Sequence, residues 1–450
     1  PLTDSRVTLA FPSMGKYGTE ALAASFRRTG INAMALPPVD DRILQIGRDF
    51  TSGKECLPAI FTIGSMLDYC RHTFKKERKD EVLVFFMPTA GGPCRFGQYN
   101  VYMKVLVRTL GLRDVAIFSP SAENGYGNLG LRLTMGAWSS VVVSDLMFEV
   151  RSALSVCAKD PDHALETFET EWKRVLSALE IGEITLAKCL KSVASRLRKI
   201  PLQTSPAKAR KVLLAGEIFV RCDRQARRSI EDMYAKNGII LKRSDIMEWI
   251  YYTDWEYLQE LKREIHGSAE GGDFRNFLLP GHIGKTMEYL KAQTKFGYER
   301  AVESGFRSIL KKSGLLFTPK HNVDKVVRAG SQFINPALCG EAVLSAGVAE
   351  EAIHEKHPGY NGVIFIGAFN CMPTGVAEAV IKPYARKMQM PYLTFDTDGG
   401  PLSPNFINQI EVHIMRVKRH NKAPRTLPAG RTTRWIQRPG KPEAAFQKQA

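Results

Sequence analysis

The sequence lacks the features of a membrane or secreted protein. It contains no run of about 18 apolar residues, the length that a membrane-spanning helix requires, although 44% of its 450 residues are hydrophobic. Its first residues also lack the basic start, apolar middle and small-residue cleavage site of a secretory signal. We therefore expect a soluble cytoplasmic protein, large enough to form two or three domains with hydrophobic cores.

Closely spaced cysteine pairs are also missing. The eight cysteines stand singly along the chain, and no Cys-x-x-Cys sequence occurs. Structural zinc sites usually contain such pairs, and an intracellular chain of this size is not expected to depend on disulfides. The thiols therefore either pack in the core or converge from separate loops on a metal.

Acidic residues are scarce at the C-terminal end. The net charge is +17, and the stretch from Arg416 to Ala450 contains ten Lys or Arg residues and one acidic residue, a net charge of +9. Residues 421–450, rich in Pro, Gly and Gln, are expected to form a disordered basic tail. Nucleic-acid binding is not expected, because no aromatic residues alternate with the basic ones as in a binding groove.

Apolar runs bounded by turn residues alternate with helix-periodic segments. They predict an α/β fold with two Rossmann-like parallel-sheet domains and a helical insertion between them. The expected parts are an N-terminal α/β domain (1–127), a helical section (128–206), a C-terminal α/β domain (207–420) and the tail. The expected strands are Val7–Phe11, Asn32–Leu36, Val82–Phe86, Val115–Phe118, Val212–Phe219, Ile239–Leu241, Gly362–Ala368 and Tyr392–Phe395.

Four cysteines lie in loops next to expected helix starts. Cys94, in the segment Gly91-Gly92-Pro93-Cys94, follows an expected strand, and Cys371 follows another in the second domain. Cys56 precedes Pro58, and Cys339 precedes Gly340 and a helix pattern. A helix N-terminus favours an anionic thiolate by about 0.3 to 1 kcal/mol. These four thiols are therefore predicted to be metal ligands, with core packing as the competing interpretation.

The other cysteines have weaker contexts. Cys222 follows an expected strand without Gly or Pro framing, and we keep it as a less favoured ligand candidate. Cys70, Cys157 and Cys189 fall inside helical patterns and are expected to pack in the core. Scattered single thiols favour an iron–sulfur cluster held between domains over a zinc site.

Other motifs carry weaker signals. The segment Gly125–Gly130 matches the dinucleotide fingerprint, but it does not directly follow its strand. The segment Gly281–Thr286 resembles the end of a phosphate loop but lacks the first glycine, so a turn is expected there. The Asp396–Gly400 segment is expected to cap a strand, and His354 and His357 to lie on a solvated helix face. No ATPase motif is apparent.

Three cysteine motifs occur together in one order. They are Lys54-Glu-Cys56-Leu-Pro58, Gly91-Gly-Pro-Cys94-Arg-Phe-Gly-Gln-Tyr99 and Cys371-Met-Pro373. With these motifs the chain, from about Val7 to Arg419, resembles the 2-hydroxyacyl-CoA dehydratase and benzoyl-CoA reductase superfamily. The resemblance is closest to the double-cubane cluster proteins and to the dehydratase-like segments fused to CoA-enzyme activases.

The resemblance implies an iron–sulfur protein that receives low-potential electrons from an ATP-hydrolysing activase. That activase, separate or fused, has its own iron–sulfur cluster, and the electrons reduce or dehydrate a small substrate, an acyl-CoA being one candidate. The cofactor would be a 4Fe-4S cluster or a double-cubane 8Fe-9S cluster. Its ligands would be Cys56, Cys94, Cys371 and Cys339, and a double cubane would also require Cys222 and a helical cysteine.

Two further expectations and one alternative accompany this resemblance. Arg95 and the Gly92 backbone are expected to hydrogen-bond the cluster sulfurs and tune their potential. The chain is expected to form a homodimer or to be part of a longer chain. The alternative is a non-catalytic scaffold or electron relay that docks on a larger assembly through its basic tail.

Overall fold

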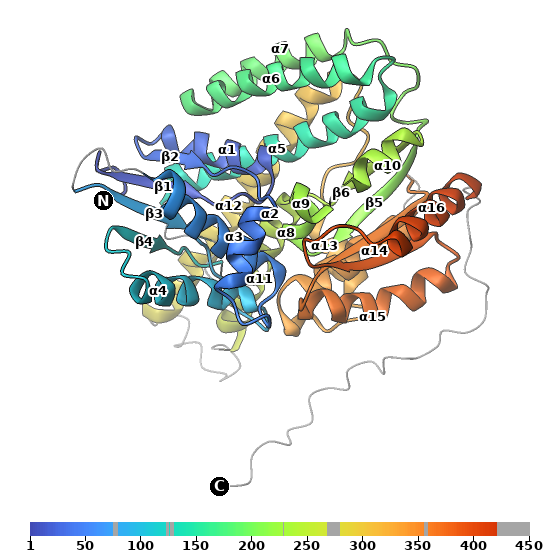
Figure 1. The fold of residues 1–450 in the computed structure, drawn as a ribbon. Coiled ribbons are helices and arrows are strands. Elements are labelled where there is room, and N and C mark those ends of the chain that lie inside the picture. Colours follow the sequence, from blue (N-terminus) through green and yellow to red (C-terminus); the bar gives the residue numbers. More distant parts are fainter. Residues whose placement is uncertain are drawn as a thin grey trace.

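The computed structural model describes residues 1–74, 80–122, 126, 130–227, 229–267, 280–354 and 359–420. They contain two four-stranded parallel sheets flanked by helices (Figure 1). The first sheet has the order β2-β1-β3-β4 and the second the order β6-β5-β7-β8. The strands are β1 (Val7–Phe11), β2 (Asn32–Ala35), β3 (Val82–Phe86), β4 (Val115–Phe118), β5 (Arg210–Gly216), β6 (Ile239–Arg243), β7 (Gly362–Ala368) and β8 (Tyr392–Thr397).

The strand order indicates where each sheet is expected to bind a ligand. The order reverses direction between β1 and β3 in the first sheet and between β5 and β7 in the second. In open parallel sheets, ligands collect beyond the carboxyl ends of the strands at such a reversal. The Cys94 loop follows β3 and the Cys371 loop follows β7, so both lie where this rule places a site.

The predicted α/β fold is confirmed, and all eight expected strands are present within a few residues of their expected limits. Burial explains this agreement. A central strand such as β7 is buried along its full length, so its sequence is a continuous apolar run that can be recognised without the structure. One prediction was wrong in its limits. The strand expected to reach Phe219 ends at Gly216, since the Glu217 side chain caps the short helix α8 (Ile218–Cys222) by accepting from the Val220 N–H.

The helices fill the connections between strands. In the first unit they are α1 (Lys16–Arg27), α2 (Asp41–Asp49), α3 (Leu57–Asp68) and α4 (Tyr99–Thr109), with short turns at Tyr69–Thr73 and Arg95–Gln98. In the second they are α8, α9 (Arg224–Arg227), α10 (Ile230–Lys236), α11 (Met247–Gly267), α12 (Pro280–Leu310), α13 (Val323–Gly330), α14 (Glu341–His354), α15 (Met372–Lys387) and α16 (Pro404–Arg419), with 3-10 turns at Lys311–Ser313 and Pro336–Leu338.

A helical section connects the two sheets. It consists of α5 (Leu131–Cys157), α6 (Pro161–Ile181) and α7 (Glu183–Leu197), and α6 and α7 lie above α1 and α5 in Figure 1. Residues of α1 and of all three helices share one hydrophobic core with residues of β5, β7 and α14. The helical section therefore packs against both units.

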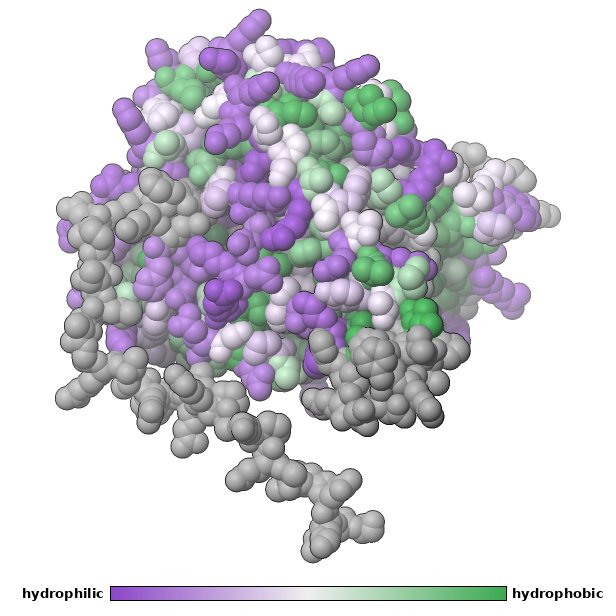
Figure 2. Space-filling view, turned by 180° about the vertical axis from the view of Figure 1, so that it is seen from behind, coloured by the Kyte–Doolittle hydropathy of each residue, from purple (hydrophilic) through white to green (hydrophobic). Residues whose placement is uncertain are grey.

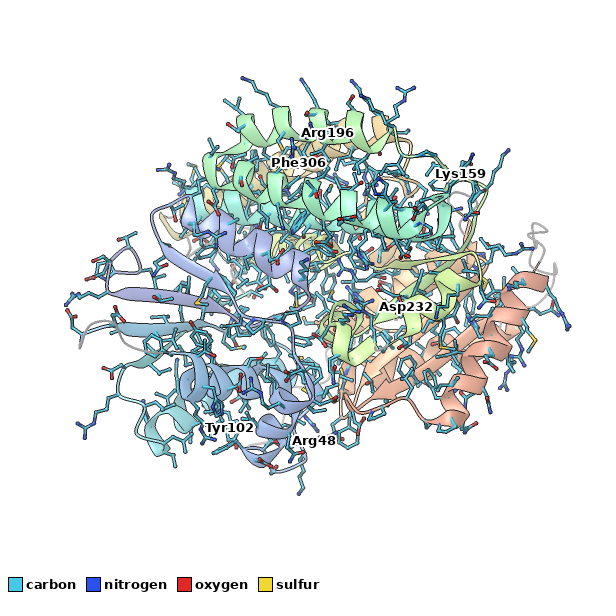
Figure 3. All side chains as sticks on the ribbon, turned by 45° about the horizontal axis from the view of Figure 1, so that its top comes forward. Arg48, Tyr102, Lys159, Arg196, Asp232 and Phe306 are labelled. Carbon is cyan, nitrogen blue, oxygen red and sulfur yellow. The ribbon has the colours of Figure 1, made fainter. Side chains whose placement is uncertain are left out.

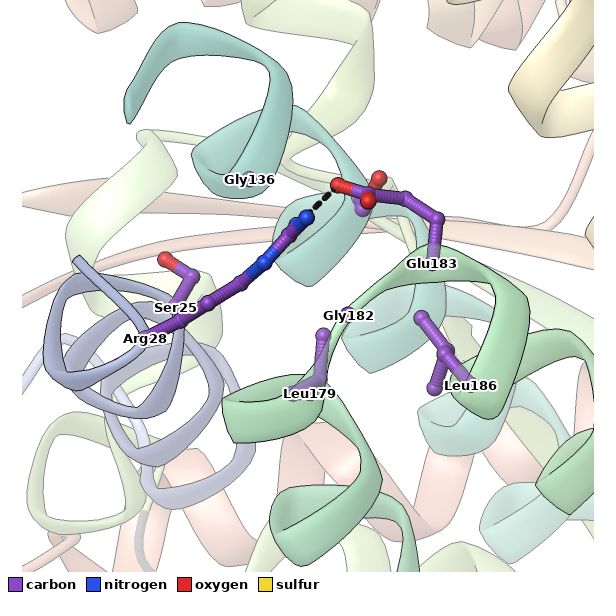
Figure 4. A pocket seen from close by; sticks show the side chains of 8 residues that line it. Ser25, Arg28, Gly136, Leu179, Gly182, Glu183 and Leu186 are labelled. Carbon is purple, nitrogen blue, oxygen red and sulfur yellow. Dashed lines mark hydrogen bonds and ion pairs between the residues drawn. The ribbon is translucent and has the colours of Figure 1, made fainter. Parts of the chain in front are cut away.

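An ion pair closes the joint between α1 and α7. Arg28, next to the end of α1, pairs with Glu183 at the start of α7, and Gly136 of α5 lies beside them (Figure 4). The side chains leave no space there for a water molecule. This joint is structural and offers no binding cavity.

Polar contacts also join the two sheet units directly. Arg48 donates from Nη2 to the carbonyl and the carboxylate of Asp398, each at 3.0 Å. Tyr102, which donates to the Phe50 carbonyl at 2.7 Å, lies at the same edge of the first unit as Arg48 (Figure 3). The first unit is thereby connected to the loop that follows β8.

Polar side chains dominate the face of the molecule in Figure 2, and hydrophobic ones lie scattered among them. Among the helices that the structure describes, none combines the length and the apolar character of a membrane span.

Candidate functional site

Three of the four predicted ligand cysteines occupy the same local position. Cys56 precedes α3, Cys94 precedes the Arg95–Gln98 turn and Cys371 precedes α15, each as the residue that begins a helical segment. Pro58 and Pro373 stand in the first helical turns after two of them, where proline's missing N–H costs no hydrogen bond. Each of these thiols therefore lies at the positive end of a helical turn.

The three loops converge on the backbone carbonyl of Lys54. Arg95, next to Cys94, donates to this oxygen from Nη1 at 2.5 Å, and Asn370, next to Cys371, donates from Nδ2 at 3.4 Å. The Leu57 N–H, next to Cys56, donates to the Phe369 carbonyl at 3.3 Å. These bonds connect segments from the two different sheets and bring the three cysteine loops to one junction.

Cys339 approaches the same junction from another direction. A Cβ on Gly92 would lie 3.5 Å from the Cys339 Cβ, so the Cys94 loop and the Cys339 turn are in contact. Gly92 has a φ of +77°, which favours glycine there. Cys339 precedes a helix as predicted: it ends the Pro336–Leu338 turn with a φ of +55°, and α14 starts two residues later at Glu341.

Cys222 occupies a different environment. It is the last residue of α8 and is buried, and the charged groups that act on its thiol are those of Arg243, Arg221, Asp145 and Arg227. The prediction that it directly follows a strand was wrong, because β5 ends earlier. Its surroundings are a buried ionic network, unlike those of the loop thiols.

The remaining cysteines pack where they were expected to. Cys157 is fully buried at the end of α5, and Cys189 packs partly buried on α7. Cys70 lies partly buried against the core of the first sheet.

Arg95 contacts the backbone of another cysteine loop, and the expectation that it hydrogen-bonds cluster sulfurs stays a prediction. Its guanidinium donates to the Lys54 carbonyl and thereby connects two of the cysteine loops. Its positive charge also lowers the pKa of the Cys56 thiol, although burial has the larger effect and raises it. Arg95 therefore connects the Cys94 loop to the Cys56 loop through the Lys54 carbonyl. Gly92 allows the Cys339 turn to approach the Cys94 loop closely.

Two buried carboxyl groups that the sequence did not single out lie beside the thiols. Glu217 follows β5, and Glu341 begins α14, where it accepts a hydrogen bond from Arg221 Nη1 at 3.0 Å. Burial and the neighbouring Glu217 together raise the pKa of Glu341 to about 8, against the opposing effect of Arg221. Burial raises the pKa of Glu217 as well.

Burial also decides the protonation of the thiols. Together with the nearby Glu341 and Glu217 carboxyls, burial raises the pKa of Cys94 to about 12. The pKa of Cys371 is raised by the same causes. The helix N-termini therefore do not make these thiols anionic by themselves. A bound metal ion would do so, since it replaces the thiol proton.

The spacing of the thiols distinguishes two kinds of metal site. A single zinc ion holds its sulfur ligands at about 2.3 Å and so about 4 Å from one another. Among the described residues, no three cysteine sulfurs lie within 4.8 Å of one another. In a cluster each thiolate binds a different iron, which spaces the sulfurs more widely. The described thiols therefore do not have the spacing of three cysteine ligands around one zinc ion.

The competing motifs gain no support as sites. The Gly281–Thr286 turn was predicted wrongly, since α12 runs through this segment. Asp398 pairs with Arg48 and accepts from the Gly400 N–H at 2.9 Å. His354 contacts the Tyr384 hydroxyl at 2.7 Å, and His357 lies outside the described residues. Most of the Gly125–Gly130 segment also lies outside them, while Gly130 precedes α5.

No protein-family model matches the chain, and no curated protein matches its sequence.

Proposed function

We propose that Cys56, Cys94 and Cys371, with Cys339 as a further ligand, bind an iron–sulfur cluster at the junction of the two sheets. The observation that carries this proposal is the convergence of three cysteine loops on the Lys54 carbonyl, through hydrogen bonds from Arg95 and Asn370. Loops from two sheets meet there without forming a disulfide, since all four cysteines are free. A cluster at this place would hold the two units together through its ligands.

The proposed activity is the transfer of low-potential electrons to a small substrate, with its reduction or dehydration. The electrons come from an ATP-hydrolysing activase, and the substrate class is that of acyl-CoA esters. The cluster supplies one-electron chemistry when bound. The cysteine motifs and their order support this proposal, and the proposed compartment is the cytoplasm, where thiols stay reduced.

The chain's own groups define what surrounds the cluster position. Glu217 and Glu341 supply buried carboxyl groups that can hold a proton beside the thiols, and Arg221 supplies a buried positive charge that balances anionic ligands. Tyr99 contacts the Cys56 sulfur with its hydroxyl group, and this hydrogen bond would lower the electron density on the sulfur.

Anaerobic reconstitution tests the proposal. The full chain, incubated with ferrous iron and sulfide and then desalted, is expected to be brown and to bleach when a strong reductant is added. A Tyr99→Phe variant should bind the same amount of iron but with a shifted reduction potential. A chain that stays colourless, or whose colour does not respond to reductant, contradicts the proposal.

A further inference from the structure

A second group of ligating side chains lies away from the cysteines. Asp245 follows β6, Glu248 lies in the first turn of α11 and His321 precedes α13. One ligand atom from each lies within 4.8 Å of the others, and no other such group of His, Cys, Asp or Glu occurs among the residues that the structure describes. Asp245 stands at the carboxyl end of the second sheet, the edge at which parallel sheets bind ligands.

The distances match those around one metal ion. His321 Nε2 lies 3.1 Å from Asp245 Oδ2 and 3.4 Å from Glu248 Oε1. A tetrahedral ion bound at about 2.0 to 2.2 Å by nitrogen and oxygen separates its ligand atoms by about 3.3 Å. The three side chains therefore need little movement to share an ion.

A buried carboxylate fixes the orientation of the histidine ring. Glu303 accepts at Oε1 from the His321 backbone N–H at 3.1 Å and contacts the ring Nδ1 at 3.0 Å. Its other oxygen accepts from the Tyr251 hydroxyl at 2.9 Å. Histidine metal ligands commonly bind a carboxylate through the nitrogen that faces away from the metal. Nε2 of His321 is thereby directed toward Asp245 and Glu248.

Two observations indicate that the group is incomplete without a ligand. Oε2 of Glu248 is buried and has no hydrogen-bond partner within the described part of the chain, which is unfavourable for a carboxylate oxygen. A cavity of about 10 Å³, close to the volume of one water molecule, lies beside Glu248 and His321. It is also lined by Asn322 and by the apolar side chains of Val323, Val326 and Leu344.

Lys242 does not occupy the ligand position. Its ammonium group pairs with Oδ1 of Asp245 and donates to the Arg243 carbonyl at 2.8 Å. The other Asp245 oxygen, Oδ2, faces His321 Nε2 at 3.1 Å. Lys242 thus holds the Asp245 carboxylate in place.

We propose that Asp245, Glu248 and His321 bind a divalent metal ion of the manganese and zinc class, with Glu303 as the residue that positions His321. Two carboxylates and one imidazole form a hard-to-borderline donor set that suits these ions. The competing account is an ion-pair network in which the ring of His321 carries a proton. Burial lowers the pKa of His321, but the hydrogen bonds that its ring donates to Asp245, Glu248 and Glu303 raise this pKa well above its usual value.

Manganese is the probe that separates this site from the cysteines, since Mn²⁺ prefers oxygen and nitrogen to thiolate ligands. The full chain, freed of metal with a chelator, is titrated with Mn²⁺ and followed by electron paramagnetic resonance. We expect one tightly bound ion per chain with magnetic coupling to one histidine nitrogen. A Cys94→Ser variant should bind Mn²⁺ as the wild type does, so failure of the cluster proposal would leave this result unchanged.

Variants complete the test. Glu248→Gln removes the unpartnered carboxylate charge and should weaken Mn²⁺ binding at least tenfold, and Glu303→Gln should weaken it about 10- to 100-fold. The matched control is Glu350→Gln, which changes a Glu–His pair on α14 with a 3.6 Å separation and should leave binding unchanged. Equal binding by the wild type, Glu248→Gln and the control, or the absence of nitrogen coupling, overturns the proposal in favour of the proton-bearing network.

Discussion

Arg95 donates a hydrogen bond from Nη1 to the backbone carbonyl of Lys54, at 2.5 Å. This bond connects the residue after Cys94 to the segment before Cys56, although the two segments are far apart in the sequence. The same carbonyl accepts from Asn370, next to Cys371. One backbone oxygen therefore connects three cysteine loops that lie far apart in the sequence.

Removing the Arg95 side chain should loosen this junction without unfolding the protein. Because Arg95 is exposed, the Arg95→Ala variant should change the free energy of unfolding by less than about 0.5 kcal/mol. It should nevertheless release iron from the reconstituted protein several times faster, as followed by transfer of the iron to a chelator. The control is Arg113→Ala, at another exposed arginine, and equal release rates in the two variants would show that the Lys54 contact does not hold the site.

Gly216 should tolerate no side chain, because it allows the chain to turn from β5 toward Glu217. Its φ is +107°, and an added Cβ would lie 2.0 Å from the Ile366 carbonyl oxygen. Gly216→Ala should therefore lower the free energy of unfolding by about 3 kcal/mol or more, measured by urea denaturation.

Gly238 provides the control for that substitution. It also has a positive φ, of +70°, but no atom lies within 4 Å of its added Cβ. Gly238→Ala should cost only about 1 to 2 kcal/mol, the strain of the left-handed conformation. Equal losses in both variants would mean that the contact with Ile366 does not matter.

His413 should make the fold sensitive to acid. It is buried on α16 beside the Tyr234 hydroxyl, 2.6 Å away, and burial lowers its pKa to about 4. In the unfolded chain the pKa of His413 is about 6.5, so below that pH this histidine is protonated in the unfolded state, and protonation favours unfolding. The stabilisation is fully present above pH 6.5 and is lost as the pH falls toward 4, by up to about 3 kcal/mol.

Urea denaturation at a series of pH values measures this effect. His413→Gln removes the ionisable group, so the stability difference between the wild type and the variant should shrink as the pH falls from 7 to 4. If the two stability profiles stay parallel over this interval, protonation of His413 does not contribute to acid sensitivity.

The sequence predicts much of the fold because buried parallel strands are visible as continuous apolar runs. β3, β4 and β7 have the predicted limits. The predicted end of β5 fails for a physical reason. Phe219 and Val220 continue the apolar run, yet Glu217 accepts from the Val220 N–H and starts a helix, so local capping outweighs the strand pattern.

The candidate sites are predictable only in part. Gly and Pro mark the loops of Cys56, Cys94 and Cys371, and in the structure each of these cysteines begins a helical segment as predicted. No local signal marks Glu341 or His321. Tertiary packing brings Glu341 beside Arg221 and His321 beside Asp245, and single-sequence patterns do not encode such contacts.

Quantification of iron and acid-labile sulfide in anaerobically purified protein tests the central proposal most directly. The wild type and a Cys189→Ser control, changed at a cysteine on α7, should contain about four or about eight irons per chain with matching sulfide. Cys94→Ser should lose most of both while keeping its fold by circular dichroism. Folded wild-type protein without iron or sulfide, or a Cys94→Ser variant with the full wild-type content, would contradict the account.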